Sequence, residues 1–69
     1  MLDKNKVKEV ISDLIIIHNY MSNNLEFRSD IMQHISYEAV TQFLTCLEDN
    51  GYISDEELDK FCYQVNYYN

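Results

Sequence analysis

Gly51 is the only glycine in this chain of 69 residues, and the chain contains no proline. Turns between short β-strands depend heavily on these two residue types, because glycine adopts positive φ angles and proline fixes φ. No segment alternates apolar and polar side chains in the way that a half-buried strand does. The sequence therefore predicts an all-α fold.

Apolar side chains recur at helical spacing in three segments. The first begins near Asp3 or Asn5 and ends at Ser22, the second follows Ser36, and the third lies close to the C-terminus. A shorter helical piece is predicted from Ser29 to His34. We therefore expect a small bundle of three main helices plus one short helix.

The chain is too short for two hydrophobic cores, so residues 1–69 are expected to form a single helical domain. Its predicted core consists of the apolar residues that share the inner faces of the three main helices. These residues are Val10, Ile11, Leu14, Ile17, Val40, Phe43, Leu44, Leu47, Leu58, Phe61 and Val65.

The segment DNGYISDEEL resembles half of an EF-hand calcium loop around Gly51 and Glu57. In that register Cys46 takes the first ligand position, where a thiol is a poor partner for a cation that requires oxygen. A helix–turn–helix junction explains the same residues, with Gly51 ending one helix and Ser54 and Glu57 forming a capping box for the next. We expect the junction, and no metal ion.

The stretch SDIMQHISYEAVTQFLTCLEDNGYIS, residues 29–54, resembles the middle of a helix-turn-helix or winged-helix DNA-binding domain. The resemblance implies that a recognition face would consist of Ser36, Tyr37, Glu38, Thr41, Gln42 and Thr45. None of these residues is Lys or Arg, on which affinity for phosphates and guanine mainly depends. After Ile53 a winged helix has strands, whereas SDEELDKFCYQV predicts a helix.

Charge is distributed unevenly along the chain. The formal net charge is −7, yet residues 1–8 contain three lysines and one acid, and residues 36–59 contain seven acids with neither Lys nor Arg. A surface of this kind repels nucleic-acid backbones and anionic lipid and attracts basic partners. The apolar run LIII is too short to cross a bilayer, and no signal peptide is recognisable, so we expect no membrane association and a cytoplasmic location.

Acidic and tyrosine side chains share one face of the last predicted helix. Exposed tyrosine provides a large contact area at a small entropic cost, so such a face suits the recognition of another protein. With the acids at the end of the preceding helix, the predicted partner-binding residues are Glu48, Asp49, Glu56, Asp59, Tyr63 and Tyr67.

No catalytic motif is present. His18, His34, Cys46 and Cys62 have no spacing typical of a metal or nucleophilic site. Cys62 lies on an apolar stripe and is expected to behave as a small buried hydrophobe, and His18 is expected to border the core. We predict no catalytic residue, no metal site and no cofactor.

The sequence favours a small acidic non-enzymatic binding protein that inhibits or regulates a partner by occupying its basic, nucleic-acid-binding surface. Its Asn, Ile, Tyr and Lys residues suggest a low-GC origin and, by analogy of composition, a phage or mobile element. The alternative is a helix-turn-helix-like DNA-binding transcription regulator, working as a dimer. For a chain this short, a homodimer is a hypothesis under the first function as well. A third hypothesis is an assembly module with a helical partner.

Overall fold

The computed structural model describes residues 2–23 and 35–66 and contains three helices in that part of the chain, with no strand. They are α1 (Lys4–Ser22), α3 (Tyr37–Asp49) and α4 (Asp55–Gln64). The all-helical fold is thus confirmed, whereas the short helix predicted between Ser29 and His34 lies outside the described residues.

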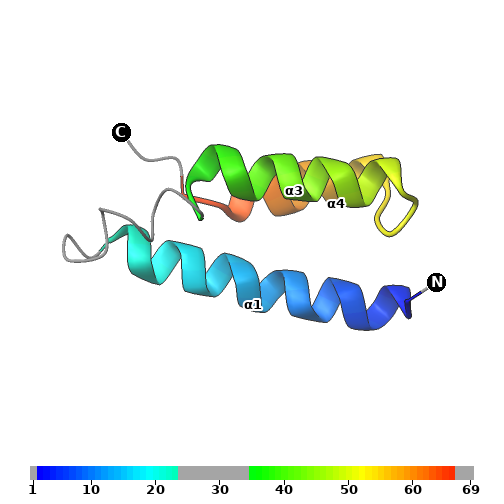
Figure 1. The fold of residues 1–69 in the computed structure, drawn as a ribbon, viewed down its shortest axis with the longest axis horizontal. Coiled ribbons are helices and arrows are strands. Elements are labelled where there is room, and N and C mark those ends of the chain that lie inside the picture. The colour runs from blue at the N-terminus through cyan, green and yellow to red at the C-terminus, as the bar shows by residue number, and fades with distance from the viewer. Residues whose placement is uncertain (1, 24–34, 67–69) are drawn as a thin grey trace.

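The helices lie side by side along the long axis of the molecule (Figure 1). α3 and α4 run in opposite directions and are joined by a short turn, and α1 packs against both of them. The start of α1 therefore lies at the same end of the bundle as the α3–α4 turn (Figure 1).

Side chains cap the first two helices where the sequence indicated a start. The Asp3 carboxylate accepts hydrogen bonds from the backbone N–H groups of Asn5 at 2.9 Å and Lys6 at 3.4 Å. The Ser36 hydroxyl accepts one from the N–H of Ala39 at 3.1 Å. These bonds satisfy N–H groups that have no partner inside the helix, and they fix both boundaries.

The turn after α3 depends on Gly51, whose φ is +82°. This left-handed conformation lets the N–H of Gly51 bond to the carbonyl of Glu48 at 3.0 Å and that of Tyr52 to the carbonyl of Leu47 at 2.9 Å. Together these bonds form a Schellman motif. Ile53, which follows this motif, is buried in the core. The conformation of the turn and the packing of the core therefore depend on each other.

Replacing Gly51 with alanine is expected to lower the free energy of unfolding by about 1–2 kcal/mol, because an L-residue resists a left-handed conformation. A Cβ there would meet no atom within 4 Å, so the cost is one of backbone strain alone. Gly51→Asn is the matched control, since asparagine tolerates this conformation. Urea unfolding of the three proteins tests the ranking, and equal stability of the alanine and glycine forms would contradict it.

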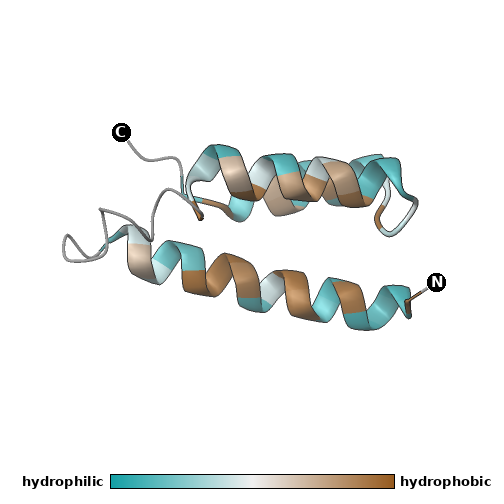
Figure 2. Cartoon of the chain, viewed as in Figure 1, coloured by the Kyte–Doolittle hydropathy of each residue, from teal (hydrophilic) through white to brown (hydrophobic). Residues whose placement is uncertain are grey.

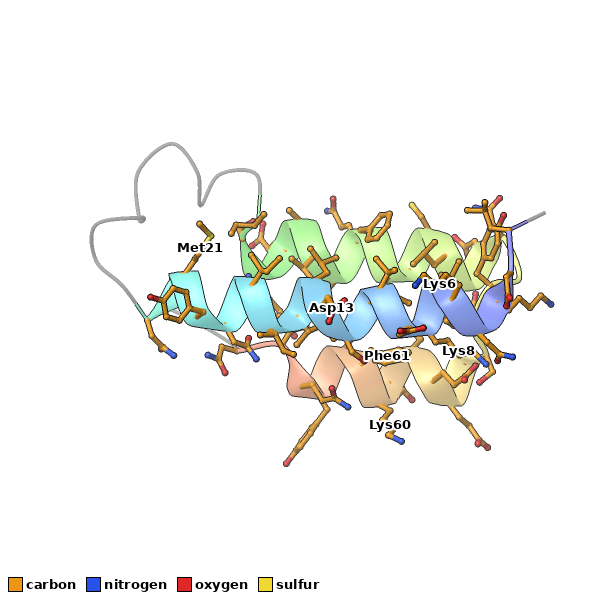
Figure 3. All side chains as sticks on the ribbon, turned by 90° about the horizontal axis from the view of Figure 1, so that it is seen from below. Lys6, Lys8, Asp13, Met21, Lys60 and Phe61 are labelled. Carbon is orange, nitrogen blue, oxygen red and sulfur yellow. The ribbon has the colours of Figure 1, made fainter. Side chains whose placement is uncertain are left out.

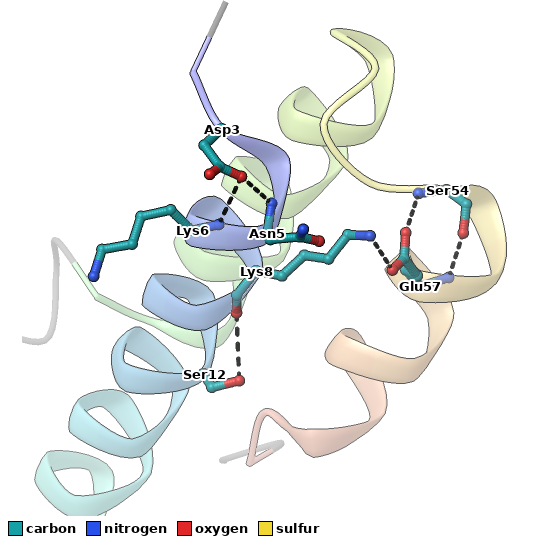
Figure 4. Close-up of polar contacts among 7 residues, drawn as sticks. All are labelled: Asp3, Asn5, Lys6, Lys8, Ser12, Ser54 and Glu57. Carbon is teal, nitrogen blue, oxygen red and sulfur yellow. Dashed lines mark hydrogen bonds and ion pairs between the residues drawn. The ribbon is translucent and has the colours of Figure 1, made fainter.

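The opening of α4 is the predicted capping box. The Ser54 hydroxyl accepts from the N–H of Glu57 at 3.1 Å, and the Glu57 carboxylate accepts from the N–H of Ser54 at 2.8 Å (Figure 4). The chain after Ile53 is therefore helical, as predicted, where a winged helix would continue into strands.

The core lies between the three helices. Its buried apolar residues are Ile11, Ile15, Val40, Leu44, Ile53 and Val65, with Val7, Leu14, Tyr37, Leu47, Leu58, Phe61 and Cys62 partly buried against them. Of the predicted core, four residues are fully buried and another four are half-buried.

The prediction was wrong for three core residues. Val10 and Ile17 are each 52% exposed, and Phe43 is 49% exposed. α1 faces its neighbours through a stripe that includes Ile11 and His18. Val10 and Ile17 each precede a residue of that stripe, so they lie about 100° around the helix. The apolar surface of α1 is therefore wider than the part that the other two helices cover. Figure 2 shows hydrophobic positions, in brown, recurring along α1.

Candidate functional site

Carboxylates gather where α3 ends and α4 begins. We define the acidic patch as Glu48, Asp49, Asp55, Glu56 and Asp59, all of which are exposed except the half-exposed Glu48. The pKa of the Glu48 carboxyl is raised above its usual value, first by desolvation and then by the negative charges of Asp49 and Asp55. The turn therefore brings like charges from two helices together.

Glu57 does not belong to this patch, although the nearby acids Asp55, Glu56 and Asp59 do. Its carboxylate lies 2.8 Å from the Lys8 ammonium, so the pair joins α4 to α1 (Figure 4). The hydrogen bond from Lys8, followed by that from the backbone of Ser54, lowers the pKa of Glu57. Glu57 therefore has a structural role, whereas Asp55, which was not among the predicted partner-binding residues, belongs to the patch.

On the outer face of α4, Tyr63 lies next to the acids of the acidic patch. Glu56, Asp59 and Tyr63 are all exposed, and Tyr63 is 91% exposed. This arrangement follows from their spacing, which puts them on the side of the helix away from Leu58 and Phe61. Tyr67, the last of the predicted partner-binding residues, lies outside the described part of the chain.

The two cysteines differ in their surroundings. Cys46 is exposed on α3, and Cys62 is half-buried rather than fully buried. Burial, and then the charge of Asp59, raise the pKa of the Cys62 thiol, which keeps it in the less reactive protonated form. Within residues 2–23 and 35–66, no group of three or more His, Cys, Asp or Glu side chains could hold a metal ion.

The first half of the calcium-loop resemblance falls inside a helix. Cys46, Glu48 and Asp49 all belong to α3. An EF-hand loop is not helical over these positions, because its first, third and fifth residues must turn their oxygens toward one ion. The helix–turn–helix interpretation of this segment therefore agrees with the structure.

His18 is fully buried, which corrects its predicted place at the border of the core. One ring nitrogen, Nδ1, contacts the carbonyl oxygen of Ile35, and the other, Nε2, lies 3.4 Å from that of Asn66. The neighbouring Asn19 side chain donates to the carbonyl of Gln64 and accepts from the N–H of Asn66, both at 2.9 Å. The end of α1 thereby holds the chain segments before α3 and after α4.

An apolar groove between α1 and α3 was not predicted from the sequence. It has a volume of about 480 Å³ and is lined mainly by Leu2, Val7, Val10, Leu14, Phe43 and Leu47. Past Leu14 and Phe43, a second hollow continues it toward Ala39 and Ile35. In the sequence, the groove was indicated only by the apolar stripe of α1, which is wider than one buried helix face.

Most hydroxyl groups of the possible DNA-recognition face are already engaged. Ser36 caps α3, and the Thr41 and Thr45 hydroxyls donate to the carbonyls of Tyr37 at 2.8 Å and Thr41 at 2.9 Å. Glu38, Gln42 and Thr45 are the exposed members of that face. None of the three carries a positive charge for a phosphate.

Comparisons of the chain with protein-family models, with curated proteins and with solved structures find no significant match. No helix among the described residues is long and apolar enough to span a membrane.

Proposed function

We propose that this protein is a small acidic binding protein, without catalytic activity of its own, that inhibits or regulates a partner by occupying the partner's basic surface. Its contact surface is the acidic patch together with the exposed ring of Tyr63. Over residues 35–66 seven acids stand against one lysine, Lys60, a net charge of −6. Such a field attracts a basic partner and speeds its association.

The observation that carries this proposal is the crowding of Glu48, Asp49 and Asp55 at the turn. Neighbouring like charges oppose folding, and after desolvation the negative charges of Asp49 and Asp55 contribute to the raised pKa of Glu48. The two ion pairs recorded within residues 2–23 and 35–66, Lys6–Glu9 and Lys8–Glu57, do not reach these three carboxylates. Lysine or arginine side chains of a partner would relieve the repulsion on binding.

A nucleic-acid channel is the kind of basic surface that fits best. Carboxylates of the acidic patch follow the turn and the outer face of α4, and arginine forks that bind phosphates bind carboxylates in the same bidentate way. Tyr63 adds an aromatic ring of the type that anchors protein interfaces. The protein would then compete with nucleic acid for its partner.

Reversing Asp49 and Asp59 to lysine is expected to weaken partner binding at least tenfold, mainly through slower association and a loss of salt dependence. Reversing Glu9 and Glu38 changes the net charge equally but lies outside the acidic patch, so that control should weaken binding less than threefold. Both variants should keep the helical circular-dichroism spectrum, because exposed charges contribute little to stability.

The partner itself can be identified by affinity capture from the native host at low salt, with the Asp49→Lys, Asp59→Lys variant as the negative bait. The captured protein should be released by nucleic acid and by salt. A partner bound equally by both baits, or insensitive to salt, would contradict the proposal. A gel-shift experiment with random duplex DNA tests the helix-turn-helix alternative, since tight DNA binding by the isolated protein would replace the present proposal.

A further inference from the structure

α1 carries a second apolar stripe beside the one that enters the core. Val7, Val10, Leu14, Ile17 and Met21 follow one another at alternating steps of three and four residues, the spacing of the a and d positions of a coiled coil. Val10 and Ile17 are 52% exposed, and the first three of these residues line the apolar groove together with Lys6 and Ile11. The stripe therefore has the form of a helix-docking face.

The outer edge of this stripe carries two opposite charges. Lys6 and Asp13 are seven residues apart, so they hold equivalent positions on α1, and both are exposed on the side of α1 that faces the viewer in Figure 3. The inner edge of the stripe consists of Ile11 and His18, which are buried within the bundle. Only the edge with the two charges is open to another helix.

We propose that the N-terminal half of this face, centred on Val7 and Val10, binds a second copy of the chain, with the two α1 helices antiparallel. In an antiparallel pair the same edge of each helix faces its counterpart. Lys6 of each copy then lies opposite Asp13 of the other, which gives two equivalent ion pairs. A parallel pair would instead bring this edge against Ile11 and His18, which the molecule's own core already covers.

The charges also select one register of the two helices. When Lys6 faces Asp13 of the second copy, Val7 faces Val10 of that copy, and the centre of the contact falls on the apolar groove. Phe43 and Leu47 then cover the second α1 from the α3 side. A shift by one heptad would place the two Asp13 carboxylates against each other, and like charges at such positions oppose pairing.

This interface is distinct from the acidic patch. The patch lies on the α3–α4 turn and the outer face of α4, whereas the groove lies between α1 and α3. Dimer formation and partner binding should therefore differ in their dependence on salt concentration. Contact between apolar surfaces survives salt that screens surface charges, so the dimer should persist at ionic strengths that release a basic partner.

Sedimentation equilibrium in the presence of a reductant, which excludes disulfide formation through the exposed Cys46, is expected to give a mass about twice the 8.3 kDa of the chain. Val10→Asp should weaken dimerisation at least tenfold while keeping the helical spectrum, because Val10 is already half-exposed in the monomer. A chain that remains monomeric at millimolar concentration would overturn the proposal, as would a dimer that Val10→Asp leaves unchanged.

A charge exchange tests the antiparallel register. Lys6→Asp alone and Asp13→Lys alone should each weaken the dimer about tenfold, because each creates two repulsive pairs across the interface. The double variant restores opposite charges and should return to within about threefold of the native affinity. Lys60→Asp is the matched control on the outer face of α4 (Figure 3) and should have no effect. Failure of the double variant to recover would contradict the register.

Discussion

Leu44→Ala is expected to lower the free energy of unfolding by about 3–5 kcal/mol. The Leu44 side chain is completely buried in the middle of α3, where it contacts the core formed by all three helices. Truncation removes its transfer free energy and leaves a cavity that a bundle of only three helices cannot fill without moving one of them. A domain of this size has a total stability of the same order, so the variant should be largely unfolded at 37 °C.

Phe43→Ala is the matched control, because it removes a larger side chain from the neighbouring position. Phe43 is half-exposed at the apolar groove, so its loss should cost about 1 kcal/mol or less in the monomer. Urea unfolding followed by circular dichroism, at a concentration low enough to keep the chain monomeric, measures both values. Equal losses of stability in the two variants would contradict the orientation of α3 that buries Leu44 and exposes Phe43.

Local signals in the sequence were sufficient for the helices and their ends. Asp3, Ser36 and Ser54 cap the three helices through bonds to residues two or three positions ahead. Gly51 ends α3 through its own backbone conformation. All these interactions are between near neighbours in the chain, so residue type and spacing were enough to place them.

The rotation of each helix about its axis could not be predicted in the same way. Both Val10 and Ile11 are apolar, and only the positions of α3 and α4 decide that Ile11 enters the core while Val10 is left at the groove. Phe43 and Leu44 are likewise both apolar, and the sequence alone does not show that Leu44 is the buried one. A stripe wider than one buried face is consistent with several packings, and tertiary contact selects one of them.

The composition of the candidate site was predictable, but its pairings were not. The run of acids after Leu47 indicated a negative surface. That Glu57 turns to Lys8 while Glu48 is left among like charges depends on the approach of α1 to α4. These partners are far apart in sequence. Asp55 was not among the predicted partner-binding residues, and only the fold shows that its charge acts on Glu48.

His18 shows the same limit, since its sequence context of apolar neighbours and a helix end gave no sign of its two carbonyl contacts. The ring meets the Ile35 oxygen through Nδ1 and the Asn66 oxygen through Nε2. Neutral imidazole has a single N–H, so it can donate to one of these oxygens at a time, and the imidazolium can donate to both. In either form the ring fills the space between the end of α1 and the segments that flank α3 and α4.

His18→Ala is accordingly expected to destabilise the protein by about 3 kcal/mol, through a cavity and through carbonyl oxygens left without a donor. His18→Phe separates these two causes, because a phenyl ring restores the volume but cannot donate a hydrogen bond. It should still cost about 1–3 kcal/mol. Urea unfolding gives the totals, and hydrogen exchange at Val65 reports whether the segment after α4 loosens first. Native stability of the phenylalanine variant would mean that His18 acts by packing alone, and that the Asn19 side chain, with its two 2.9 Å bonds, holds that segment by itself.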